Sequence, residues 1–293
     1  MIWLIKILGV VLCVPFFTLL ERKILSYSQN RKGPKKVRIL GLLQPVSDGV
    51  KLIIKSSGSP FSANQYLFYI FPVVRFILTL RFIFFFPRKF NSYLFHLGII
   101  GIICISSLGI YTLLGRGWRS KSKYSLLGSL RGAAQVISYE IKLVFLIIFP
   151  CTLLMKYKLK RFYSKYLFFV GFFFLVILWC FMVLCETNRA PFDFAEGERE
   201  LVSGFNTEYS SLLFTFLFLR EYGKIIFFSW FLRCLFSIFR LWFLSYFLFF
   251  FFLFMFLWCR ATFPRFRYDF LMIFSWCVSL PIVTIIFWLA FCF

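Results

Sequence analysis

The chain has 293 residues, 61% of them hydrophobic, and a formal net charge of +23 at pH 7. Soluble domains contain about 45–50% apolar residues, so this composition excludes a soluble fold and predicts a chain that lies within a lipid bilayer. The basic residues stand in short segments between apolar runs and form no nucleic-acid-binding motif. Membrane topology and anionic lipid headgroups therefore explain the charge better than DNA or RNA does.

Apolar stretches long enough to cross a bilayer recur along the whole chain. A transmembrane helix needs about 20 predominantly apolar residues. Eight stretches meet this condition: residues 2–20, 66–86, 91–114, 132–155, 166–186, 208–233, 238–259 and 270–292. We therefore predict an all-α membrane protein with about eight transmembrane helices in a single integral membrane domain, residues 1–293.

Residues 44–55 predict a shorter helix between the first two spans. Pro45 suits a first helical turn. The apolar residues share one helical face: Leu42, Val46, Val50, Ile53 and Ile54. Because the segment is too short to span, it is expected to be an interfacial amphipathic helix, the alternative being a loop helix packed on protein.

The connecting segments fall into two sets by charge. With an even number of spans, residues 21–55, 115–131, 187–207 and 260–269 lie on one side and hold 19 Lys and Arg residues, against 10 on the opposite side. The positive-inside rule places the first set, with the short interfacial helix, on the cytoplasmic or matrix side.

The acidic residues gather on this same side. Nine of the eleven Asp and Glu residues lie in or beside the first set of segments: Glu21, Asp48, Glu186, Asp193, Glu196, Glu198, Glu200, Glu208 and Asp269. Acids contribute little to membrane orientation, so their asymmetry indicates a function on the inner face. Residues 186–208 hold most of them and are too polar to span, which favours an acidic funnel over a passive solvated loop.

Two carboxyls, Glu140 and Glu221, lie inside predicted spans. An ionisable group at the centre of a span costs about 2.5–3.5 kcal/mol, so both are expected to face protein or water. Carboxyls at graded depths suit a proton path. The alternative is a structural ion pair, of Glu140 with a neighbouring helix or of Glu221 with Lys224. Three other cations are expected to snorkel or to form ion pairs: Arg75, Arg81 and Lys142.

The nine cysteines stand singly, without a CxxC pair, and the chain has one histidine, His96. Metal clusters and haem need closely spaced Cys and His ligands. We therefore expect no metal site held by this chain alone.

Long motifs occur in order along the polar segments. They read ERKILSYSQNRKGPKKV with GLLQPVSDGVKL, GSLRGAAQVISYEIKL, ETNRAPFDFAEGERELVSGFNTEY with LREY, and WCRATFPRFRYD. Together they resemble the subunit 1 family of NADH:ubiquinone oxidoreductase, the quinone-module membrane subunit of respiratory complex I, which has a bacterial counterpart. The 47 phenylalanines are typical of T-rich coding, so we expect a mitochondrially encoded member.

The resemblance implies a subunit of the proton-translocating NADH:ubiquinone reductase that is not catalytic alone. The family forms the access tunnel for ubiquinone and an acidic path that couples quinone reduction to proton translocation. It binds ubiquinone together with partner subunits and holds no flavin or iron–sulfur cluster. We accordingly expect the mitochondrial inner membrane, with the motif-bearing loops and the interfacial helix on the matrix side. The expected partners are other complex I subunits and phospholipids such as cardiolipin, not nucleic acid.

By position, the resemblance assigns roles to single residues. The quinone tunnel, with the 44–55 helix at its entrance, is assigned Arg22, Arg31, Phe218 and Arg260. The proton path is assigned Glu140, Glu186, Asp193, Glu196, Glu198, Glu200, Glu208 and Glu221. Supporting partners of these acids are Arg131 and Arg189. One departure is Arg199, which stands between acids where the family usually has a small residue.

Two other functions remain open from the sequence. The homologous membrane subunit of a membrane-bound hydrogenase would share the motifs without binding quinone, and the tunnel arginines argue against it. A stand-alone secondary transporter often shows inverted repeats, and this sequence has no such symmetry. A quinone-binding enzyme subunit is the favoured interpretation.

Overall fold

The structure, a computed structural model, describes residues 2–36, 41–56, 58–60, 64–85, 98–154, 173–193, 208–236 and 242–292. Regular structure in these residues is helical, and none of them lies in a strand. The helices are α1 (Ile2–Ser28), α2 (Gln44–Ile54), α3 (Gln65–Phe84), α4 (Gly98–Ser120), α5 (Lys123–Leu154), α7 (Phe173–Glu186), α9 (Ser211–Phe236), α10 (Trp242–Thr262), α11 (Tyr268–Ile273), the π-helix η4 (Phe274–Ser279) and α12 (Leu280–Cys292).

Each of the eight predicted stretches contains a helix in its described part, and α11, η4 and α12 together form the last. Parts of the predicted spans 66–86, 91–114, 132–155, 166–186 and 238–259 lie outside the described residues. Four stretches of described residues are long and apolar enough to cross a membrane: Gln65–Phe82, Gly98–Ser120, Lys123–Pro150 and Tyr268–Trp288. Leu175–Glu186 and Tyr246–Thr262 are apolar but shorter. These features confirm an all-α membrane protein, whereas the exact number of spans and the single domain stay predictions.

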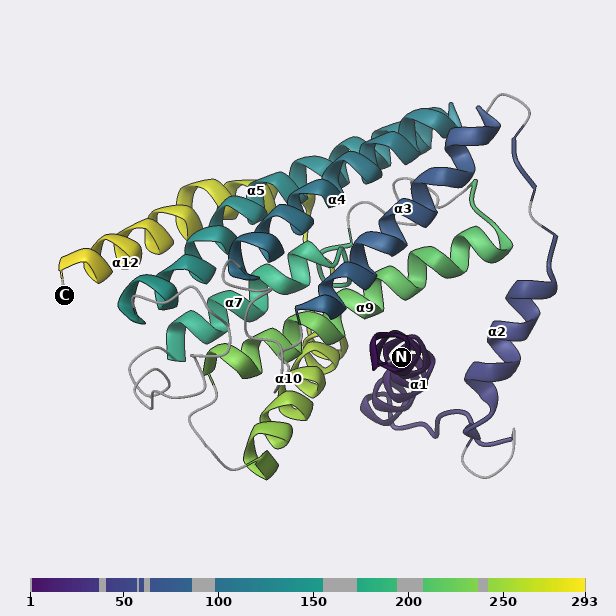
Figure 1. The fold of residues 1–293 in the computed structure, drawn as a ribbon, viewed down its shortest axis with the longest axis horizontal. Helices are drawn as coiled ribbons and strands as arrows, with labels where there is room; N and C mark the ends of the chain where they lie inside the picture. The colour runs from purple at the N-terminus through teal and green to yellow at the C-terminus, as the bar shows by residue number, and fades with distance from the viewer. Residues whose placement is uncertain are drawn as a thin grey trace.

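Most of the helices pack side by side, each on the next, and α1 and α2 lie on one side of them, against α9 (Figure 1). Helix α4 packs on α3 and α5, α9 packs on α3, and α7 and α12 pack on α5. Helices α1 and α2 contact each other and α9. Helices α4 and α5 approach closely because Gly117 has no side chain: a Cβ there would overlap Ser129.

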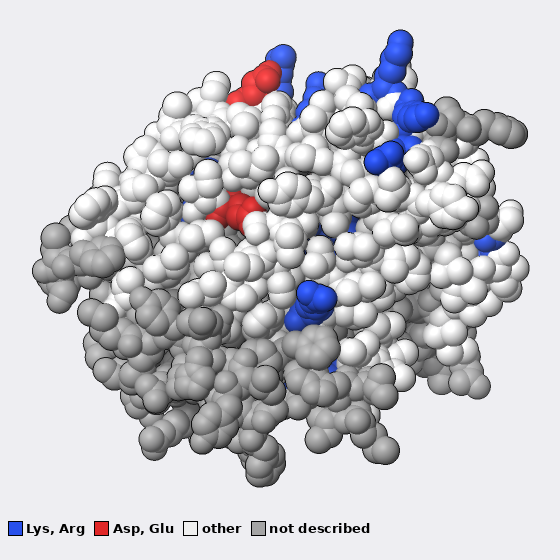
Figure 2. Space-filling model, turned by 45° about the horizontal axis from the view of Figure 1, so that its top comes forward, with Lys and Arg blue, Asp and Glu red and all other residues white. Residues whose placement is uncertain are grey.

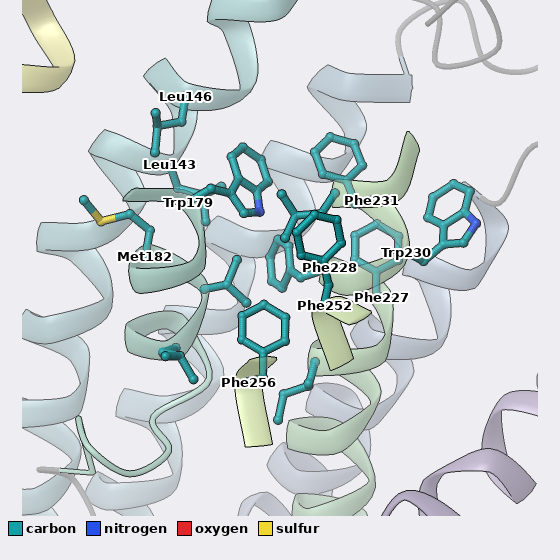
Figure 3. Close-up of a cluster of buried hydrophobic side chains, with 14 of the residues drawn as sticks. Leu143, Leu146, Trp179, Met182, Phe227, Phe228, Trp230, Phe231, Phe252 and Phe256 are labelled. Carbon is teal, nitrogen blue, oxygen red and sulfur yellow. The ribbon is translucent and has the colours of Figure 1, made fainter. Parts of the chain in front are cut away.

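The core lies around α7 and α9 and is built largely from aromatic rings (Figure 3). The ring centroids of Trp179 and Phe231 are 5.6 Å apart, and those of Phe82 and Phe227 are 4.6 Å apart. Large rings bury much apolar surface in fixed orientations, so this core holds α9 firmly between its neighbours. The charged side chains of α9 are placed by the same packing.

Outward faces are apolar as well. On α10, the exposed residues follow helical spacing and form one stripe: Phe247, Phe250, Phe254 and Trp258. On the face drawn in Figure 2, most of the described surface is uncharged and basic side chains gather towards one edge. An exposed apolar stripe of this kind is suited to lipid, because water would disfavour it.

Candidate functional site

The carboxylate of Glu21 joins three helices. Glu21 lies near the polar end of α1 and is 4% exposed. The Tyr222 hydroxyl of α9 donates to its Oε2 at 2.5 Å, and Arg260 Nη1 of α10 forms an ion pair with its Oε1. Both carboxylate oxygens are therefore bound, as a buried charge requires.

Arg189 extends this contact to a second acid. It stands in the turn after α7, where its Nη1 donates to the Tyr222 hydroxyl at 3.2 Å and its Nη2 lies 3.0 Å from Glu221 Oε2. Its guanidinium also lies over the rings of Tyr222 and Phe218, with its central carbon 4.2 and 5.3 Å from their centroids. A planar guanidinium can stack and donate several hydrogen bonds at once, so Arg189 orders this corner of the site.

A second buried ion pair lies one helical turn farther along α9. Lys224 Nζ contacts Glu186 Oε1 at 2.5 Å, and both side chains are almost inaccessible to solvent. Glu186 is the last residue of α7. Because Glu221 and Lys224 are three residues apart on one helix, the two ion pairs are neighbours.

Glu140 of α5 ends the series. Its Oε1 accepts a hydrogen bond from Ser106 Oγ of α4 at 3.0 Å. Glu186 and Lys224 are close enough to interact with it electrostatically. We call the following set the buried charged row: Glu21, Arg260, Tyr222, Arg189, Glu221, Lys224, Glu186, Glu140 and Ser106.

The turn after α7 is fixed by the local sequence and by α5. Asn188 adopts a left-handed conformation, with φ of 51°, which asparagine tolerates better than most residues and which ends the helix. Gln135 Nε2 of α5 donates to the carbonyl oxygens of Cys185 at 3.1 Å and Phe192 at 3.0 Å. Both ends of the turn are thus held, and Glu186 and Arg189 point into the row.

The sequence was compared with known proteins. A family model described as NADH dehydrogenase matches residues 1–291. The chain belongs to the NADH dehydrogenase family. Proteins named NADH-ubiquinone oxidoreductase chain 1 are 46% identical in Aedes aegypti and 45% in Anopheles gambiae, each over 95% of this chain and 90% of the relative. The protein of that name in Branchiostoma lanceolatum is 40% identical over 93% of this chain and 88% of the relative. These matches favour the first of the three functions considered above.

Three of the four tunnel residues inferred from the family lie at or beside the row. Arg260 binds Glu21, and the Phe218 ring stacks on Tyr222 with centroids 6.2 Å apart. Arg22 pairs at 2.7 Å with Asp48 of α2 and so ties α2 to α1. The fourth, Arg31, is exposed beyond the end of α1.

The inferred proton-path acids divide into three groups. Glu140, Glu186 and Glu221 lie in the row. Asp193 lies 3.8 Å from Arg265 Nη2, and Glu208 is half-buried just before α9. Three acids lie outside the described residues: Glu196, Glu198 and Glu200. Of the two supporting arginines, Arg189 pairs with Glu221, whereas Arg131 lies over the Tyr268 ring at 5.9 Å.

Two interpretations that the sequence left open for buried charges are wrong. Glu221 does not pair with Lys224, because Arg189 binds Glu221 and Lys224 binds Glu186. Lys142 does not snorkel, because its ammonium group is fully buried between α5 and η4. The ion-pair partner of each acid depends on the conformation of the turn after α7. Sequence spacing does not reveal that conformation.

The sequence reasoning missed four members of the row as site residues: Glu21, Tyr222, Lys224 and Ser106. The signal for Tyr222 was its position directly after Glu221 in the LREY motif. Among the described residues, no group of three His, Cys, Asp or Glu side chains is placed to hold a metal ion.

Proposed function

We propose that this chain, a membrane subunit of NADH:ubiquinone oxidoreductase, lines the entry route of ubiquinone and couples its reduction to proton translocation. The observation that carries the proposal is the buried charged row. Direct contacts run from Arg260 and Glu21, beside the tunnel residues, through Tyr222 and Arg189 to Glu221. The Lys224–Glu186 pair follows one turn along α9, and it interacts electrostatically with Glu140 between α4 and α5.

Glu140 is the member of the row best suited to exchange a proton. Glu21, Glu186 and Glu221 each bind a cation directly. The hydrogen bond to Glu140 comes instead from the neutral Ser106 hydroxyl. Carboxyls inside a membrane are commonly parts of proton relays, so a proton gained or lost at Glu140 would be felt by the Lys224–Glu186 pair.

The proposed quinone route combines an apolar surface for the isoprenoid tail with arginine donors for the polar headgroup. Leu43, just before α2, and Val46, Val50 and Ile54 of α2 line an open, largely apolar hollow, which suits an isoprenoid tail. Arg22 binds Asp48 of α2 and Arg260 binds Glu21 of α1, and the donors of both arginines suit the carbonyl oxygens of a quinone headgroup. Partner subunits complete the headgroup site in this proposal.

The proposed surroundings follow from the family and from the charge pattern. Other complex I subunits are the partners, and the membrane is the mitochondrial inner membrane. The motif-bearing loops and α2 face the matrix, together with the acids Asp193, Glu196, Glu198, Glu200 and Glu208. Anionic phospholipids such as cardiolipin contact the exposed basic groups.

The purified complex containing this chain, reconstituted in liposomes, tests the proposal. Glu140→Gln should lower proton translocation driven by NADH and ubiquinone about tenfold, since the amide cannot carry a proton between sites. Asp269→Asn is the control, because this exposed carboxylate pairs only with Arg267 among the described residues and lies outside the row. Undiminished translocation in Glu140→Gln would remove the row from the coupling path. Failure of quinone-site inhibitors to block NADH oxidation would count against the quinone route.

A further inference from the structure

Lys142 is a buried cation that the row does not use. Its side chain is 0% exposed and projects from α5 towards the last helical stretch. Nζ donates to the Ser275 carbonyl oxygen at 2.9 Å and to Ser279 Oγ at 3.3 Å, and it lies 4.2 Å from the centroid of the Tyr139 ring. No carboxylate in the described part of the chain forms an ion pair with it. Polar groups and one aromatic face therefore stabilise the ammonium group. Burying a cation costs enough free energy that its position indicates a function.

The carbonyl that binds Lys142 belongs to the π-helix η4. In this wider turn the N–H of Leu280 bonds to the Ser275 carbonyl, five residues back. The same oxygen accepts the Ser279 hydroxyl at 2.9 Å. Lys142 thus adds a charged donor to the carbonyl on which the π-turn depends. Single π-turns inside α-helices occur frequently at functional sites.

Neighbouring residues of α5 bind the same stretch. The Tyr139 hydroxyl donates to the Leu271 carbonyl oxygen, and Trp276 Nε1 donates to Ser138 Oγ, each at 3.3 Å. Together with the Lys142 contacts, these bonds form a polar seam between α5 and the α11–η4 stretch. Seen down the helix, successive residues are about 100° apart, so Glu140 faces almost opposite to Lys142.

We propose that Lys142 is a positioning residue for Glu140. Its hydrogen bonds to η4 fix the rotation of α5 about its axis and its position along that axis. They thereby hold the Glu140 carboxyl against Ser106 and beside the Lys224–Glu186 pair. The inference rests on the proposed proton path and adds a residue to it. It also gives η4 a purpose, because an ordinary α-turn would place the Ser275 carbonyl elsewhere.

A double-mutant cycle in the reconstituted complex tests the proposal. Lys142→Met keeps the length of the side chain and removes its charge, and it should lower proton translocation about tenfold. Lys142→Arg keeps a cationic donor and should restore translocation to within about twofold of the original level. Since Lys142 acts through Glu140, the double variant with Glu140→Gln should be no worse than the poorer single variant.

The outcomes separate this inference from the function it rests on. Normal translocation in Glu140→Gln would overturn the proton path and the inference together. Reduced translocation in Glu140→Gln with normal translocation in Lys142→Met would overturn the inference alone, as would losses that multiply in the double variant. If Lys142→Met does not assemble, Ser279→Ala takes its place, because it removes one acceptor of Lys142 and leaves the charge. Normal translocation in Ser279→Ala would then overturn the inference.

Discussion

A single hydroxyl group joins two parts of the buried charged row. The Tyr222 hydroxyl donates a hydrogen bond to Glu21 and accepts one from Arg189. This single oxygen atom therefore links α1 to the turn after α7. The Tyr222 ring also packs edge-to-face against the Phe17 ring, with the ring centroids 5.7 Å apart. Packing and hydrogen bonding at this residue can therefore be separated by mutation.

Tyr222→Phe removes the hydroxyl and keeps the ring. Glu21 loses a donor and Arg189 loses an acceptor, so we expect NADH:ubiquinone reductase activity to fall about tenfold, or about 1.4 kcal/mol. Activity of the purified complex measures the effect. Tyr111→Phe on α4 is the matched control, because its side chain is 71% exposed. Equal activity in both variants would show that the hydroxyl link is not used.

Sequence reasoning at this scale found three of the four acids of the row and one of their partners, Arg189, but not the other partners. Ionisable residues in apolar stretches stand out, because burying them is costly, and this singled out Glu140 and Glu221. The partners come from distant segments: Tyr222 and Glu21 are 201 residues apart in the chain, and Lys224 and Glu186 are 38 apart. Spacing on one helix offered Lys224 as an alternative partner for Glu221, which is wrong because tertiary packing brings Arg189 to Glu221 instead.

At the scale of elements, helix α2 matches the prediction for residues 44–55. Pro45 occupies its first turn, where a missing N–H costs little, and its apolar residues share one exposed face. The π-helix η4 was not predicted. Its residues fit the apolar pattern of an α-helix, and the Lys142 contact that accompanies it comes from 133 residues away. Local periodicity thus predicted the helices and missed the irregular turn.

Val50→Glu tests the apolar face of α2. A carboxylate there would meet the proposed quinone tail, so we expect the KM for ubiquinone to rise about tenfold, with little change in kcat. Gly49→Glu is the control, because a side chain at that position enters open space. Steady-state kinetics of the complex with ubiquinone give both values. A similar KM in the two variants would place the quinone tail elsewhere.

For the whole molecule, the excess of positive charge is the dominant property. The formal net charge is +23, and the basic side chains visible in Figure 2 gather towards one edge of a mostly uncharged face. The composition alone predicted the membrane class, and the family motifs predicted the enzyme. The arrangement of the helices around α7 and α9 depends on aromatic packing between distant segments, which no local pattern encodes.

Anionic lipid should stabilise the complex through these basic groups. Moving it from phosphatidylcholine nanodiscs to ones containing cardiolipin should raise the thermal unfolding midpoint by about 2–4 °C, since each basic group near an anionic surface contributes about 1 kcal/mol. High salt should reduce the gain by screening. Differential scanning calorimetry measures the shift. A gain that persists undiminished at 1 M salt, where the Debye length is about 3 Å, would point to a cause other than charge.

The three-way contact at Glu21 has a mechanical consequence. One carboxylate of α1 holds α9 and α10 to it through Tyr222 and Arg260. A ligand that competes for the Arg260 guanidinium would break the ion pair of α10 with Glu21. Glu21 would then be bound by the Tyr222 hydroxyl alone. The binding of one small molecule at Arg260 would then remove the ion pair between α1 and α10 and keep the hydrogen bond between α1 and α9.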